Sequence, residues 1–296
     1  MNGPENEGVT RIMFGLKTSM GSRAACTFMA AILVVVVVLV NSPANAAPVP
    51  VRFPEGVAHG YLLVRSLVGK TIGQGELTQV AKEGDLVESH LVLNFKDGSL
   101  YDEKVAFSQQ RVFTMIRYHL LQRGPSFPDQ IDVSIDRGTA EYKVRSQAGK
   151  DGREEVLTGH FDLPNDVYNG MFVMVLKNLL KEANATVNFL AFTPSPEAIQ
   201  LQLRFIGERT VHIGDLSTKA KHYVLKPQIG KIRQFFGKLS GQLPTDFHYD
   251  WWILTDHVPG FVQFEGPLQL MGPIVRIELV SPRLSPQPED KQIPAN

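Results

Sequence analysis

Short β-type segments recur along this chain, and turn residues separate them roughly every 8–15 residues. That spacing is typical of a sandwich or barrel built from antiparallel strands, so it limits the fold to the mainly β class. The expected strands are 59–68, 75–81, 86–95, 100–107, 111–121, 131–135, 140–144, 156–163, 186–192, 199–206, 209–213, 218–225, 247–254, 261–270 and 274–280.

Two turns predict hairpins between neighbouring strands. Asp97-Gly98 lies between two apolar runs and predicts a type I′ turn, in which both central residues have positive φ. Asp136-Arg137-Gly138 predicts a second hairpin. Both turns favour antiparallel neighbours that are consecutive in the chain.

Side-chain alternation indicates which strands have a wet face. Residues 198–205 alternate with a period of two, which predicts a strand with one buried and one solvated face. Apolar positions are Ile199, Leu201, Leu203 and Phe205, and polar ones are Gln200, Gln202 and Arg204. Residues 111–121 are apolar on both faces, which predicts a core on one side and a cavity or covering element on the other.

One helix is expected, over Asp166–Lys181. Pro164-Asn165-Asp166 supplies a break and a cap, and good helix formers follow. Met171–Leu176 is apolar without interruption, which is typical of a helix buried on most sides. A central buried strand is the alternative, because Phe172, Val173 and Val175 favour β structure.

The N-terminal 46 residues have the pattern of a secretory signal peptide. Arg11, Lys17 and Arg23 precede an apolar run over 24–40, and Ala44-Asn45-Ala46 gives an A-x-A cleavage signal. We therefore expect export to the periplasm or the extracellular space. The alternative is an uncleaved N-terminal anchor formed by residues 24–40, whose length is at the lower limit for a membrane span.

Beyond the predicted leader, proline content divides the chain further. Residues 47–56 are expected to form an extended linker, residues 57–280 a single β-rich domain, and residues 281–296 a disordered Pro-rich tail. The leader holds three of the 30 basic and two of the 30 acidic residues, so the remainder carries a net charge of −1. This balance lacks the excess of basic residues that a nucleic-acid-binding protein needs, so we expect no nucleic-acid partner.

The lone cysteine, Cys26, lies in the leader, so the mature domain is expected to have no disulfide.

Large and pliable apolar residues are typical of a ligand pocket, and the alternative is a plain core, which needs similar residues. The candidate lining residues are Phe113, Met115, Phe172, Met174, Trp251, Trp252 and Phe261.

Candidate chemistry is sparse. His248, Asp256 and His257 are weak candidates for a metal or acid–base site, since no HExxH or paired HxH accompanies them. The mature chain also contains no GxSxG or SxxK motif for a nucleophilic serine. We therefore expect no metal, no cofactor and no enzymatic activity.

The order of turn and cap motifs resembles a group of uncharacterised exported bacterial β-sheet proteins. The resemblance rests on the Asp97-Gly98-Ser99 hairpin with Asp102-Glu103, and on Phe107-Ser108-Gln109, Gly124-Pro125-Ser126-Phe127, Leu163-Pro164-Asn165-Asp166 and Asn169-Gly170. A looser similarity is to periplasmic lipoprotein carriers, which are open half-barrels that shield acyl chains with helices. That similarity implies an apolar ligand, but this chain has one expected helix where carriers have several.

Together these features predict a monomeric domain with a curved antiparallel sheet or open half-barrel and one apolar helix packed against or inside it. Three functions remain open. The first is a non-enzymatic envelope protein that binds an apolar small molecule or lipid. The second is a structural or interaction protein without a small-molecule site. The third is a hydrolase or metalloenzyme centred on His248, Asp256 and His257.

Overall fold

The computed structural model describes residues 48–149, 152–179, 184–192, 195–213, 216–228, 248–254, 259–269 and 272–280. All of them belong to one compact unit, Asn45–Asn296. The predicted signal peptide at 1–46 and the predicted tail at 281–296 lie outside the described residues.

Fourteen strands and one short helix are described. The helix is α2 (Phe172–Asn178). The strands in chain order are β1 (Ala58–Ser66), β2 (Thr71–Ala81), β3 (Leu86–Phe95), β4 (Leu100–Ser108), β5 (Thr114–Arg123), β6 (Asp129–Asp136), β7 (Glu141–Ala148), β8 (Glu154–His160), β9 (Ala185–Phe192), β10 (Pro196–Ile213), β11 (Leu216–Pro227), β12 (Tyr249–Leu254), β13 (Phe261–Pro267) and β14 (Ile274–Val280).

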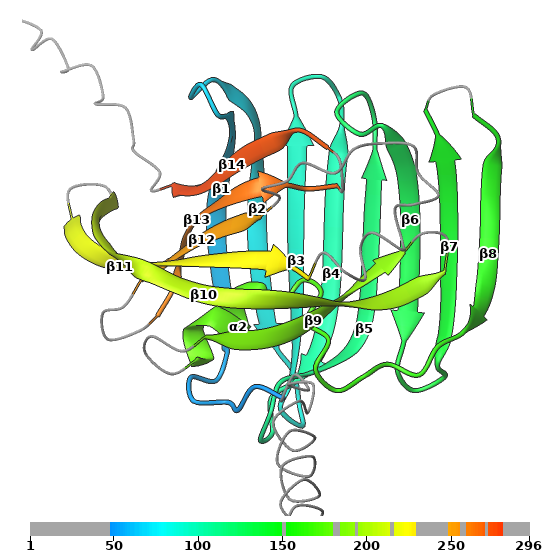
Figure 1. Cartoon of the computed structure of the whole chain (residues 1–296), viewed down its shortest axis with the longest axis horizontal. Helices are drawn as coiled ribbons and strands as arrows, with labels where there is room; N and C mark the ends of the chain where they lie inside the picture. The colour runs from blue at the N-terminus through cyan, green and yellow to red at the C-terminus, as the bar shows by residue number, and fades with distance from the viewer. Residues whose placement is uncertain are drawn as a thin grey trace, which may run out of the picture. The chain divides into compact units, whose positions relative to one another are not determined.

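All fourteen strands form one antiparallel sheet made of two meanders, β1–β8 and β9–β14. The first and last strands join them, because β1 pairs with β14 in the register Val64↔Ile277. The strand order is therefore β8 to β1 followed by β14 to β9, with β8 and β9 as the two terminal strands (Figure 1).

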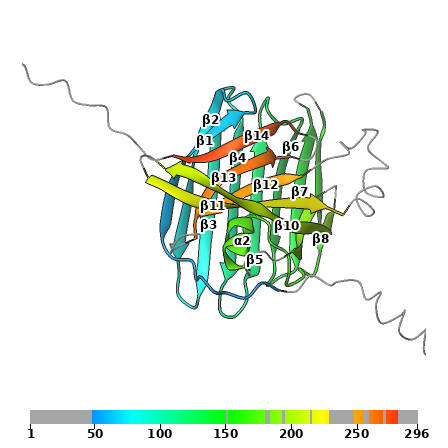
Figure 2. The same ribbon diagram turned by 60° about the vertical axis from the view of Figure 1, so that its left-hand side comes forward.

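The sheet folds back on itself, so that strands β9–β14 run across strands β1–β8 as a second layer (Figures 1 and 2). Helix α2 lies with this second layer, on the connection from β8 to β9. Alternate side chains of each strand point between the layers, as with Leu62 and Val64 of β1 and Val275 and Ile277 of β14, which are all buried. Burial of these two facing apolar surfaces is the main force that holds the layers together.

The predicted fold class is confirmed: the chain is mainly β, with a curved antiparallel sheet and a short helix packed against it. The alternation in β10 is also confirmed, since Ile199, Leu201 and Leu203 are buried while Gln202 and Arg204 are exposed. The period-two pattern was sufficient to predict this strand and its buried face, because one face packs on the core and the other is in contact with water.

The predicted helix over Asp166–Lys181 is wrong in its length, because α2 covers only Phe172–Asn178. The residues before it pair with β9: the Tyr168 N–H donates to the Asn188 carbonyl at 3.0 Å, and the Asn188 N–H donates to the Asp166 carbonyl at 3.1 Å. Gly170 then adopts a φ of 68°, which ends this extended segment and reverses the chain into the helix.

The type I′ turn predicted at Asp97-Gly98 is also wrong. Only Gly98 has positive φ, at 87°. The Phe95 N–H donates to the Ser99 carbonyl at 2.9 Å, and the Gly98 N–H donates to the Phe95 carbonyl at 3.1 Å. This is the pattern of a longer hairpin loop in which a single left-handed glycine follows the turn.

Residues 48–56, predicted as part of an extended linker, are packed on the domain. Val49 is buried, and its N–H donates to the Tyr168 hydroxyl at 2.8 Å. The backbones of Val49 and Val51 also pair with Phe113 and Arg111. The proline-rich composition gives an extended backbone, but its N–H and C=O groups find partners on the domain.

Candidate functional site

The fold forms an inner cavity of about 970 Å³ between the two layers of the sheet. Its wall is mainly apolar and takes residues from both meanders and from α2. Apolar lining residues are Leu62, Leu77, Leu91, Val105, Leu120, Ile131, Val144, Phe172, Val173, Met174, Phe189, Leu190, Ala191, Phe192, Leu201, Leu225, Trp251, Phe261, Phe264, Leu268 and Ile277.

Four of the seven predicted lining residues lie on this wall: Phe172, Met174, Trp251 and Phe261. Trp251 is at the centre of an aromatic group, with ring centroids 4.7 Å from Phe264, 6.2 Å from Phe261 and 6.1 Å from Phe172. These aromatic contacts connect β12, β13 and α2 along one side of the cavity.

The other three predicted lining residues lie elsewhere. Phe113 and Met115 are fully buried in the core. Trp252 follows Trp251 on β12 and therefore points to the opposite face, where its ring stacks on His222 at 4.6 Å and lies 4.3 Å from the Arg209 guanidinium. Residue type alone could not separate pocket from core, whereas strand parity separates Trp251 from Trp252.

A carboxyl group lies on the apolar wall of the cavity. Glu103 of β4 lines it together with Tyr101 and Tyr118, and the Tyr118 hydroxyl donates to Glu103 Oε1 at 2.9 Å. Burial raises the pKa of Glu103, and hydrogen bonds from Tyr118 and Tyr101 oppose this effect only in part. Burial likewise raises the pKa of both tyrosines, so their hydroxyls stay protonated donors.

The segment before α2 closes over this carboxyl. A Cβ on Gly170 would lie 3.4 Å from Glu103 Cδ and 3.1 Å from Val105 Cγ1, so a glycine permits the close approach. The neighbouring Asn169 is held by β9, because its Nδ2 donates to the Leu190 carbonyl at 2.9 Å and its Oδ1 accepts from the Leu190 N–H at 2.6 Å. Segments far apart in the sequence thus fix the surroundings of Glu103.

The sequence analysis did not place Glu103 among the candidate site residues, although a local signal was available. Tyr101, Glu103, Val105 and Phe107 share one face of β4 by parity, and the three others are buried. An acidic residue on an otherwise apolar strand face is the signal for a carboxyl group that lies partly buried among apolar side chains.

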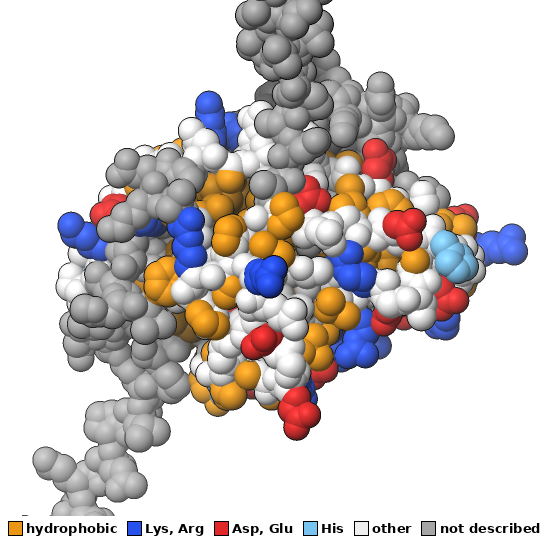
Figure 3. All heavy atoms as spheres, turned by 90° about the horizontal axis from the view of Figure 1, so that it is seen from below, with side chains coloured by type: hydrophobic (Ala, Val, Ile, Leu, Met, Phe, Trp, Pro, Cys, Tyr) orange, Lys and Arg blue, Asp and Glu red, His pale blue; other side chains and the backbone are white. Residues whose placement is uncertain are grey.

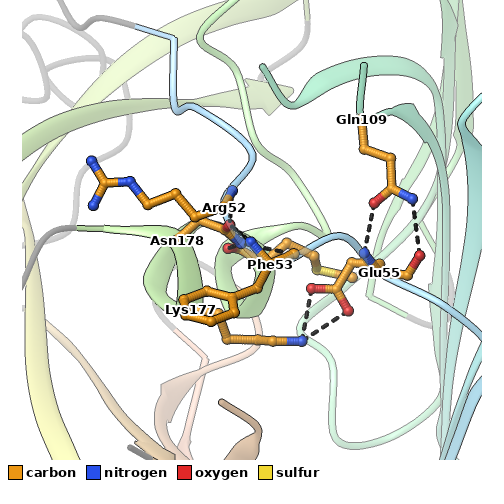
Figure 4. Close-up of polar contacts among 7 residues, drawn as sticks. Arg52, Phe53, Glu55, Gln109, Lys177 and Asn178 are labelled. Atoms are coloured by element: carbon orange, nitrogen blue, oxygen red, sulfur yellow. Dashed lines mark hydrogen bonds and ion pairs between the residues drawn. The ribbon is translucent and has the colours of Figure 1, made fainter. Parts of the chain in front are cut away.

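A second buried charge, on Glu55, is fully paired and fastens the N-terminal segment to α2 (Figure 4). Both carboxylate oxygens of Glu55 accept from Lys177 Nζ, at 2.7 and 2.8 Å. Its backbone N–H and carbonyl are both bonded by the Gln109 side chain, at 2.7 and 2.9 Å. Asn178 Oδ1 accepts from the N–H groups of Arg52 and Phe53 at 2.7 Å each. Because the charged and polar groups of Glu55, Lys177, Gln109 and Asn178 are paired with one another or with backbone groups, we assign these residues a role in stability.

Of the weak metal candidates, His248 lies in the described residues. His248 pairs with Asp250 at 3.0 Å, and His222 pairs with the same carboxylate at 2.6 Å. Asp256 and His257 lie outside the described residues. Within the described ranges, no group of three or more His, Cys, Asp or Glu side chains is arranged to hold a metal ion.

Another hollow, of about 1040 Å³, lies on the face of β3–β8 that points away from the inner cavity. Its acidic residues Glu88, Asp136 and Glu141 are matched by Lys104, Arg117 and Lys143. Seen from below, the surface likewise mixes apolar side chains with charges of both signs (Figure 3). The charges of this hollow are balanced, whereas the inner cavity has a mainly apolar wall, and we therefore take the inner cavity as the stronger candidate site.

No family model, curated protein or solved structure matches this chain. Among the described residues, no helix combines the length and the apolar character that crossing a membrane requires.

Proposed function

We propose that this chain is an exported, non-enzymatic protein that binds an apolar or lipid-like ligand in the inner cavity. The observation that carries the proposal is an apolar-lined cavity of about 970 Å³ between the two sheet layers. This volume is at the upper end of the range of about 300–1,000 Å³ for small-molecule pockets.

Incomplete burial of the lining residues supports the proposal. Leu91, Phe172, Phe189, Trp251 and Phe261 point between the layers, yet each is only partly buried. Apolar surface that stays accessible inside a fold gains free energy when a ligand covers it, about 25 cal/mol per Å². A core that served stability alone would bury these side chains completely.

Native mass spectrometry of the protein recovered from the cells that produce it tests both parts of the proposal. We expect a chain that begins after Ala46, together with a bound species that extraction into organic solvent removes. A recovered chain that carries no ligand and takes up no neutral apolar dye would contradict binding. An N-terminus upstream of Val34 in the membrane fraction would contradict cleavage, and the chain would then be an anchored protein.

A further inference from the structure

Resting on the proposed function, we infer that the apolar ligand carries a neutral hydroxyl group, which forms a hydrogen bond with Glu103 inside the cavity. Glu103 is the charged residue that lies among the apolar residues of the wall. The other charged lining residues in the described part of the chain, Asp129, Arg153 and Glu155, are exposed.

The hydrogen-bonding capacity of Glu103 fits a hydroxyl. Tyr118 donates to Oε1 at 2.9 Å, and Tyr101 also donates to the carboxyl group. A carboxylate offers about four lone-pair sites, so two tyrosine donors leave room for a further donor. A hydroxyl can donate to the ionised carboxylate or accept from the protonated acid, so it pairs with Glu103 in either state.

Unpaired polar atoms in the same wall also favour a neutral hydrogen-bonding ligand. Among the described lining residues, the donors Gln79 Nε2 and Trp251 Nε1 and the acceptors Gln122 Oε1 and Gln269 Oε1 are buried and have no hydrogen-bond partner. Gln122 Nε2 donates to the Leu268 carbonyl at 2.8 Å, which fixes the amide so that its free atom is an acceptor. Buried polar atoms are normally paired, so donors and acceptors left free beside a cavity indicate neutral polar groups on the occupant.

Charged head groups fit this wall less well. A ligand carboxylate would face the Glu103 carboxyl, and the only lysine or arginine among the described lining residues is the exposed Arg153. An ammonium group would pair only with the ionised form of Glu103, and both charges would have to leave water. A hydroxyl loses much less solvation than either ion when it enters an apolar site.

Competition for bound Nile red, a neutral apolar dye, tests the inference with three ligands of equal chain length: decanol, decanoate and decylamine. At pH 8 we expect decanol to displace the dye at a concentration about tenfold or more below decanoate, since burying an unpaired charge costs more than 1.4 kcal/mol. Decylamine should also require a higher concentration than decanol to displace the dye. This ranking is read in the unaltered protein and does not depend on the folding of any variant.

The variant Glu103→Gln identifies the group responsible. It keeps hydrogen-bonding capacity without charge, so decanol binding should persist while decanoate binding improves. Glu88→Gln, the same substitution on an exposed residue of β3, is the matched control and should leave the ranking unchanged.

The outcomes separate the inference from the proposed function. If Nile red does not bind at all, the proposed function fails. If the dye binds but the three ligands compete equally, or Glu103→Gln folds and leaves their ranking unchanged, the cavity binds apolar molecules and the hydroxyl inference is overturned. Tightest binding by decylamine, lost in Glu103→Gln, would replace the hydroxyl with an ammonium group.

Discussion

At the scale of single residues, Glu103 combines two opposing effects. The apolar wall disfavours its charge, while the hydroxyl of Tyr118 stabilises it at 2.9 Å. Desolvation is the larger effect, which raises the pKa of the carboxyl. A group of this kind reduces the stability of the fold at pH values where it is ionised, so a ligand-binding role would explain its presence.

Glu103→Gln should therefore raise the melting temperature at pH 8 and lose this advantage in acid. Because the pKa of Glu103 is raised above its ordinary value of 4.5, the folded state binds the proton more tightly than the unfolded state. Stability then falls as the pH rises from 4.5 through the raised value. Thermal unfolding of both proteins across pH 4–8 measures this difference, and Glu88→Gln is the control. Parallel pH profiles for all three proteins would contradict the raised pKa.

A substitution at Asn178 tests how the N-terminal segment is attached to α2. Its Oδ1 accepts from the N–H groups of Arg52 and Phe53, and its Nδ2 donates to the Met174 carbonyl at 2.7 Å. Asn178→Ala leaves these groups unpaired, so we expect a loss of about 1–3 kcal/mol in unfolding free energy. Asn94→Ala, at an exposed position of β3, should stay within about 0.5 kcal/mol of the unaltered protein. Denaturant titration compares the two, and equal midpoints would show that the segment is not held by Asn178.

Residue-scale features were predictable only where they follow from strand parity. Glu103 could have been found from the period-two pattern of β4. The pairing of Glu55 with Lys177 could not, because 122 residues separate them and no local pattern relates the two. Long-range polar contacts depend on the tertiary arrangement, which a single sequence does not reveal.

At the scale of elements, the sequence located strands better than it located the helix. The bounds predicted for 86–95 and 274–280 coincide with β3 and β14, because apolar alternation ends at clear turn residues. Helix α2 is shorter than predicted, since Asp166 and Tyr168 hydrogen-bond to Asn188 of β9. Asp166, expected as a cap, accepts instead from Asn188 Nδ2 at 2.7 Å. Tertiary strand pairing overrides helix propensity in this segment.

Despite its shortness, α2 is a packing element, and Met174→Asp should be strongly destabilising. Met174 is 2% exposed, so the substitution buries a carboxylate without a partner. We expect a loss of several kcal/mol, comparable with the total stability of many domains. The same substitution at Val156, which is 55% exposed on β8, should be tolerated. Circular dichroism during heating separates the two, and similar melting temperatures would show that residue 174 is accessible to solvent.

At the scale of the whole molecule, the decisive contact is the pairing of β1 with β14, which joins the two meanders into one sheet. Hairpin signals predict neighbours in sequence, but they do not indicate that the first and last strands pair. The cavity arises from this closure, because the inward faces of both meanders then face each other. The apolar character of the wall was therefore predictable from the strands, whereas its enclosure was not.

The binding of an apolar ligand in the inner cavity is tested most directly by blocking that cavity. Leu91 of β3 lines it, and the next residue, Val92, points to the opposite face of the same strand. Leu91→Trp should fill part of the cavity and abolish or greatly weaken Nile red binding, while Val92→Trp should bind the dye as the unaltered protein does. The measurement is a fluorescence titration of the three folded proteins. Equal dye binding by both tryptophan variants would contradict the account, because it would place the ligand outside the cavity.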